Sequence, residues 1–80
     1  MGYIQHNNWM KELKIIGLNV SRLRKERKLT QEDLCGIAQI DRSYLSELEN
    51  GKMNVTIKSL VTIAHALECE LTDIISNNET

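Results

Sequence analysis

Apolar residues recur at helical spacing in the first third of the chain. A stripe at intervals of three, four and three residues predicts an amphipathic helix of about four turns that ends near Lys28; it consists of Leu13, Ile16, Val20 and Leu23. The opposite side is basic and carries Lys11, Lys14, Arg22, Lys25 and Lys28. Gly17 inside this helix costs about 1 kcal/mol relative to alanine, which indicates a close neighbouring helix.

Capping residues divide the next segment into two short helices. Thr30 is a candidate N-cap followed by acids in the first turn, so a helix is predicted from residue 31 to about residue 38. Asp41 is a second candidate N-cap, for a helix over 42–49 that ends at Asn50-Gly51, where glycine can adopt a left-handed conformation. Two short helices joined by about three residues form a helix-turn-helix.

Two more helices are predicted after residue 51. Thr56 is a third candidate N-cap, and it precedes an apolar stripe at Ile57, Leu60, Val61, Ala64 and Leu67. A short last helix, over about residues 71–76, presents Leu71, Ile74 and Ile75. Five helices with short connections and no strand pattern predict an all-α fold, a five-helix bundle with a central helix-turn-helix.

Length and composition allow one domain. The 80 residues include no proline, and no apolar run approaches the roughly 18 residues that a membrane span needs. Residues 11–76 are expected to form the domain. Residues 1–10 are expected to be a flexible arm, with Trp9 as its candidate anchor, and residues 77–80 to fray. With no signal-peptide pattern at the start, a cytoplasmic location is expected.

The distribution of charge along the chain restricts the classes of function further. All ten Lys and Arg lie between residues 11 and 58, whereas residues 61–80 carry four acids and no base. This split indicates a basic surface that meets phosphate and an acidic end that stays clear of it, although chance surface patterning would look similar.

Neither a metal nor a cofactor is expected, because ligand spacing is lacking at Cys35, Cys69, His6 and His65. A Cys35–His65 nucleophilic pair stays formally open, but no acid–base pair or phosphate loop indicates an enzyme.

The helix over 42–49 has two distinct faces at about 100° per residue. Leu45 and Leu48 fall on the core side, and the opposite side carries Ser43, Ser46 and Glu47. Arg42 and Tyr44 lie at the two borders. A narrow, hydroxyl-bearing face of this kind suits the major groove of DNA, where base edges are read by donors and acceptors.

Each of these side chains has a candidate role and an ordinary alternative. Arg42 could make a bidentate contact to guanine, worth about 1–3 kcal/mol of discrimination, or it could be a surface arginine near a cap. Ser43 and Ser46 could donate to base edges or phosphate, and Gln31 is placed to hold a phosphate. Tyr44 fits either groove contact or packing at the core edge, and Glu47 is expected to face solvent.

The segment IGLNVSRLRKERKLTQEDLCGIAQIDRSYLSELENGK, continued by TIKSLVTIAHALECELTDII, resembles the helix-turn-helix domain of phage repressors and Cro-type regulators, the XRE-like family. The resemblance covers about residues 13–76, and RSYLSELENGKMNVTIKSL is similar to controller proteins of restriction–modification systems. The chain departs from the family pattern in three places. Cys35 replaces the usual alanine, Gln39 the usual glycine of the turn, and Glu70 the usual serine cap of the last helix.

The resemblance implies a transcription regulator that binds a palindromic operator in double-stranded DNA as a homodimer, with RNA polymerase as a further possible partner. It implies base contacts from Arg42, Ser43 and Ser46, which Tyr44 is expected to join. Contacts to the DNA backbone are implied for Gln31 and near Arg24, Asn50, Lys52 and Asn54.

Dimerisation is expected at the acidic C-terminal end, through Leu71, Ile74 and Ile75, with Ile63 as a further candidate. The alternative is that these residues only close the core of a single chain. A prophage-type repressor and the antitoxin of a toxin–antitoxin pair remain alternative functions. A helical protein-interaction module without DNA binding is the rival from another class.

Overall fold

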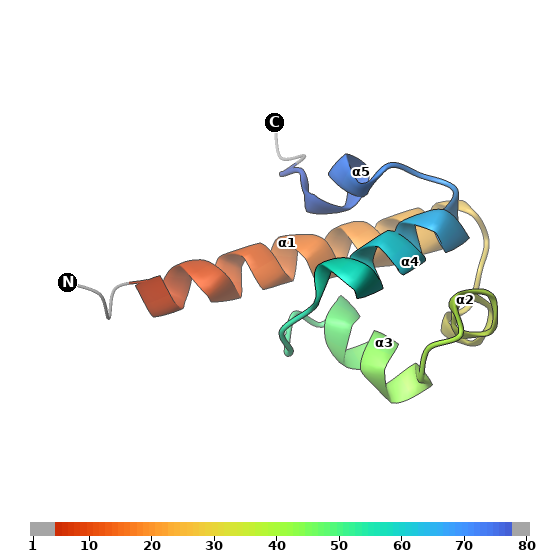
Figure 1. The fold of residues 1–80 in the computed structure, drawn as a ribbon, viewed down its shortest axis with the longest axis horizontal. Helices are drawn as coiled ribbons and strands as arrows, with labels where there is room; N and C mark the ends of the chain where they lie inside the picture. The colour runs from red at the N-terminus through yellow and green to blue at the C-terminus, as the bar shows by residue number, and fades with distance from the viewer. Residues whose placement is uncertain (1–4, 78–80) are drawn as a thin grey trace.

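The computed structural model describes the backbone of residues 5–77 and the side chains of residues 10–77. The predicted frayed segment from residue 78 and the first four residues of the predicted arm lie outside the described residues. Five helices follow one another: α1 (Gln5–Glu26), α2 (Gln31–Ala38), α3 (Arg42–Glu49), α4 (Ile57–Leu67) and α5 (Leu71–Ile75). Figure 1 shows α1 running the length of the molecule, with α3 and α5 packed against it. α2 packs on α3 and α4. The predicted all-α fold is therefore confirmed.

The first helix is longer than its apolar stripe predicts. α1 begins at Gln5 instead of near Leu13, so the segment expected to be an arm is helical from Gln5 onward. No proline or glycine lies between residue 5 and Gly17, and a helix needs an apolar stripe only where it covers a core. The N-terminal part of α1 projects beyond the other helices (Figure 1).

The ends of the helices follow the predicted caps with one exception. Thr30 Oγ1 accepts from Asp33 N at 3.0 Å, and Asp33 Oδ2 accepts from Thr30 N at 2.8 Å, which lowers the pKa of the Asp33 carboxyl. Thr56 Oγ1 likewise accepts from Ser59 N at 3.1 Å. Asp41 occupies the cap position of α3, but its side chain makes no capping hydrogen bond, so this cap prediction is only half right. Gln39 adopts the left-handed conformation that the turn requires, with φ of 58°.

The core lies where the five helices meet, and leucine dominates it. Its buried apolar side chains are Val20, Leu23, Leu34, Ala38, Leu45, Leu48, Leu60, Ile63, Ala64, Leu67 and Ile74. The stripe predicted for α4 is wrong at one position, because Ile57 is 67% exposed. The core face of α4 includes Ile63, and it is therefore rotated away from Ile57.

A buried asparagine attaches the last helix to the first. Asn19 is 6% exposed, and its Nδ2 donates to the carbonyl oxygens of Ile74 and Ser76, both at 2.7 Å. These carbonyls lie at the C-terminal end of α5, where a helix leaves acceptors without internal partners. A helix of five residues is marginal by itself, so this contact and the burial of Ile74 hold α5 in place.

The close neighbour that Gly17 predicts is α3. A Cβ built on Gly17 would lie 2.5 Å from the carbonyl oxygens of both Leu48 and Glu49. Any larger residue would push the end of α3 away from α1. This glycine therefore sets how closely the helix with the candidate reading face approaches the rest of the bundle.

We expect Gly17→Ala to destabilise the fold by roughly 1–3 kcal/mol, because backbone atoms rather than a flexible side chain obstruct the new methyl group. Gly36→Ala is the matched control, since a Cβ at Gly36 meets nothing within 4 Å. It should stabilise α2 by about 0.5–1 kcal/mol through helix propensity. Urea unfolding of both variants measures these changes, and equal stabilisation by both substitutions would contradict the close approach.

Candidate nucleic-acid interface

The outward face of α3 is the one that the sequence predicts. Leu45 and Leu48 are buried at 0% and 1% exposure, and they fix the helix on the core. Arg42, Ser43 and Glu47 are exposed on the side away from the core, and Ser46 is half-buried. The face therefore consists of two small hydroxyl-bearing side chains, the Glu47 carboxylate and one guanidinium in the first turn, where α3 lies farthest from α1 (Figure 1).

Tyr44 lies at the border between the two faces. Its side chain is half-buried and packs against the core cluster. The ring therefore has a structural role already, and only its remaining exposed part is available to a ligand. This placement matches the core-edge alternative for Tyr44 and leaves contact with DNA from its edge as a proposal.

A carboxylate that the sequence analysis did not single out joins three helices beneath this face. Glu49, at the end of α3, accepts from Arg24 Nε at 2.7 Å and from Arg24 Nη2 at 3.0 Å. Gln31 Nε2, at the start of α2, donates to the same carboxylate at 3.0 Å. The Arg24 and Glu49 side chains are only 10% and 7% exposed, so this bidentate ion pair is close to fully buried.

Arg24 is consequently not the free backbone-contacting residue that the resemblance implies. Its remaining donor, Nη1, bonds the Leu29 carbonyl oxygen at 2.8 Å, so every part of the guanidinium has a protein partner. The hydrogen bonds that Arg24 donates to the Glu49 carboxylate raise the pKa of Arg24, although burial opposes that shift. The sequence shows that Arg24 lies on the first helix. It does not show that Glu49, 25 residues later, pairs with it, and this is why a free Arg24 was expected.

Gln31 keeps the position that its predicted role requires. The residue is half-buried at the N-terminal turn of α2, and its amide is oriented by the hydrogen bond to Glu49. One amide hydrogen and the side-chain carbonyl remain for another partner. The arrangement therefore presents a fixed donor beside the first N–H groups of a helix, which is a common way to hold phosphate.

Hydrogen bonds to α3 hold the start of the loop that follows it. Gly51 has φ of 69°, and its N–H donates to the Leu48 carbonyl oxygen at 3.0 Å. Asn50 Nδ2 donates to the Ser46 carbonyl oxygen at 2.8 Å, while Lys52 and Asn54 extend into solvent. Lys52 and Asn54 are therefore accessible, as contacts with the DNA backbone would require. One amide hydrogen of Asn50 is already bonded to α3.

The predicted dimer surface needs correction at two of its four residues. Ile63 and Ile74 are both 0% exposed and belong to the core of a single chain, so neither is available to a second copy. They point inward because Ile63 lies on the core face of α4 and because Asn19 holds α5 with Ile74 beneath it. Ile75 is 46% exposed and Leu71 is half-buried, so these two remain candidates.

The two cysteines form neither a disulfide nor part of a metal-holding group in the described part of the chain. Cys35 and Cys69 are half-buried free cysteines, and burial raises the pKa of both thiols. Among residues 10–77 no group of three His, Cys, Asp or Glu side chains is arranged to hold a metal ion. None of the helices described here is both long and apolar enough to cross a membrane.

Comparison with known proteins agrees with this geometry. The helix-turn-helix family matches residues 20–74. The chain belongs to the helix-turn-helix family. The resemblance to Cro- and repressor-type regulators noted in the sequence is thereby confirmed, and the family consists of DNA-binding transcription regulators.

Several relatives of this helix-turn-helix chain are controller proteins. Control protein C.MunI from a Mycoplasma species is 38% identical over 72 residues, which cover 88% of this chain and 97% of the relative. The crystal structure of the restriction–modification controller protein C.AhdI from Aeromonas hydrophila has a TM-score of 0.77 at 31% identity, covering 80% of this chain and 97% of that one. The controller protein C.Esp1396I, solved as a tetramer in complex with its natural 35-base-pair operator, has a TM-score of 0.70 at 32% identity. That match covers 80% of this chain and 95% of the other.

Glu49 is the residue of the interface that the sequence analysis missed. It stands in the LENGK segment that carries part of the resemblance, but nothing in the sequence pairs its carboxylate with Arg24.

We expect Glu49→Ala to lower the free energy of unfolding by about 3 kcal/mol, because the buried Arg24 guanidinium loses its counter-charge. Glu26→Ala is the matched control, since it breaks the exposed Arg22–Glu26 pair and should cost less than about 0.5 kcal/mol. Urea unfolding measures both, and similar losses would contradict a special role for Glu49.

Proposed function

We propose that this helix-turn-helix chain is a controller-type transcription regulator that binds a palindromic operator as a homodimer. The observation that carries the proposal is the outward face of α3, on which Arg42 and Ser43 are exposed opposite the fully buried Leu45. Its full-length similarity to C.MunI and C.AhdI supports the controller subfamily, because the chain covers 97% of each relative. Binding rather than catalysis is the proposed activity, in the cytoplasm, where operator DNA is available.

The proposed base contacts come from α3 in the major groove. Arg42 is the residue for a bidentate contact to guanine, and Ser43 and Ser46 donate to neighbouring base edges. Tyr44 adds an edge contact from the border of the helix. Because α3 is only eight residues long, these side chains reach only a few base pairs per half-site.

The proposed backbone contacts surround α3 and position it. Gln31 approaches the phosphates from the start of α2, and Asn50, Lys52 and Asn54 approach from the loop at the other end. Arg24 acts here as a positioning residue, since it holds Glu49 and through it the Gln31 amide. Phosphate contacts of this kind supply much of the affinity and make it depend on salt.

A second copy is required to place two reading helices about one DNA turn, about 34 Å, apart. Leu71 and Ile75 on α5 are the proposed apolar centre of the dimer contact, because both retain exposed surface after Ile63 and Ile74 are buried. RNA polymerase is a further proposed partner of the bound dimer.

The test compares Arg42→Ala with Lys52→Ala on operator duplexes selected from a random-sequence pool. We expect Arg42→Ala to lose about 1–3 kcal/mol of discrimination at one base pair of each half-site. Lys52→Ala should weaken binding to all sequences alike and reduce the slope of log affinity against log salt by about one per lost contact. Binding titrations over a range of salt concentrations measure both effects.

Two outcomes would contradict the proposal. If Arg42→Ala and Lys52→Ala changed sequence preference equally, α3 would not be the element that reads bases. If the unsubstituted protein retained no palindromic duplex at low salt, the chain would instead be a helical interaction module without DNA binding.

A further inference from the structure

The N-terminal half of α1 precedes the residues that the family model matches. The family match begins at Val20, so residues 5–19 of α1 precede it. This segment projects past the loop that follows α3 (Figure 1). Ile16 packs against the core and Leu13 is half-buried, whereas Lys11 and Lys14 are exposed.

Lys14 lies directly against the loop after α3. A Cβ built on Gly51 would lie 2.9 Å from Lys14 Cγ and 3.0 Å from Lys14 Cα, so α1 and the loop are in close contact there. Lys14 and Lys52 border one open hollow of about 630 Å³, whose other lining residues include Met10 and Asn54. The Lys14 side chain therefore continues the surface formed by Lys52 and Asn54.

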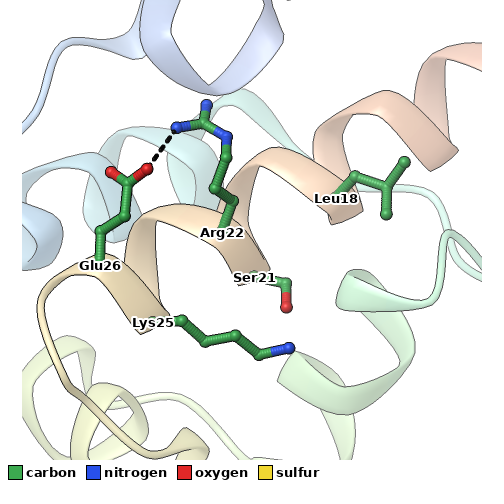
Figure 2. A pocket seen from close by; sticks show the side chains of 5 residues that line it. All are labelled: Leu18, Ser21, Arg22, Lys25 and Glu26. Carbon is green, nitrogen blue, oxygen red and sulfur yellow. Dashed lines mark hydrogen bonds and ion pairs between the residues drawn. The ribbon is translucent and has the colours of Figure 1, made fainter.

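These cations have no acidic partner in the described part of the chain. The two ion pairs among residues 10–77 are Arg24–Glu49 and Arg22–Glu26, and neither involves Lys11, Lys14 or Lys52. Figure 2 shows the contrast farther along α1, where Arg22 turns toward Glu26 and pairs with it at 3.1 Å. Lys11 and Lys14 are about one helical turn apart, about 4.5 Å along the axis. Glu12 lies between them in the sequence and borders a neighbouring hollow with Asn54, but no ion pair joins it to either lysine among residues 10–77.

We propose that Lys11 and Lys14 bind the DNA backbone outside the operator half-site, in continuation of the loop contact at Lys52. The inference rests on the proposed function, because the loop must face DNA for α1 to reach the flanking phosphates. A DNA backbone fits this surface better than a protein partner does. The free groups are ammonium groups, which bind phosphate as point charges, and they adjoin a loop already assigned to phosphate. The α1 extension thus lengthens the footprint without reading sequence.

The test measures binding of a Lys11→Gln/Lys14→Gln double variant to two duplexes. One contains only the selected operator, and the other carries about ten further base pairs, or one turn, on each side. We expect the unsubstituted protein to prefer the longer duplex, and the double variant to bind it about tenfold more weakly than the unsubstituted protein at moderate salt. The salt slope on the longer duplex should fall by about one for each lysine that loses a phosphate contact. Binding to the short duplex should be unchanged.

Arg22→Gln is the matched control, because it removes one positive charge from α1 at a position where Glu26 already compensates it. It should leave the preference for the longer duplex intact. Circular dichroism and urea unfolding should show native folds for both variants, since all three side chains are exposed.

Four outcomes would overturn the inference. Equal weakening on both duplexes would mean a general charge effect, and no weakening on either would mean that the lysines do not contact DNA. Self-association of the unsubstituted protein without DNA, abolished in the double variant, would assign the surface to an acidic face of a second copy. If the unsubstituted protein bound neither duplex, the proposed function would fail and this inference with it.

Discussion

The buried ion pair between Arg24 and Glu49 is the constraint on which the geometry of the candidate reading face depends. It joins the C-terminal part of α1 to the end of α3, and the Gln31 amide attaches the start of α2 to the same carboxylate. Three helices that contribute to the candidate interface therefore meet at one charged group. Burying such a pair stabilises a fold little by comparison with an apolar contact, but separating its partners is costly, so it fixes one arrangement of the helices.

The same constraint explains why α3 lies so close to α1. Glu49 can reach Arg24 only if the end of α3 approaches α1, and Gly17 makes that approach possible by presenting no side chain to the Leu48 and Glu49 carbonyl oxygens. A glycine in the middle of a helix weakens the helix itself, and here the cost is offset by the contact it allows. At this position the close packing of α3 on α1 therefore outweighs the low helix propensity of glycine.

Much of the fold could be predicted because its signals are local. Thr30 and Thr56 mark helix starts through their own side chains, and Gly17 and Gly51 mark positions where the backbone needs space or a left-handed turn. The outward face of α3 followed from the period of the helix. Signals that depend on distant partners could not be predicted: the Arg24–Glu49 pair spans 25 residues, and the Asn19–Ile74 contact spans 55. Ile74 is buried where the Asn19 contact holds α5 on α1.

The ion pairs also determine which charges remain for a ligand. Arg24 is neutralised inside the molecule and Arg22 on its surface, so the net charge of −1 conceals a set of unpaired lysines on α1 and on the loop after α3. The acids of the C-terminal end, among them Glu68, Glu70 and Asp73, lie on and beside α5, which packs on α1 apart from α3. A chain with almost no net charge gains little long-range attraction to DNA, but this separation gives it a charge asymmetry. Such a molecule is oriented by the field of a phosphate backbone, which favours approach by the lysine-bearing side and disfavours approach by the α5 end.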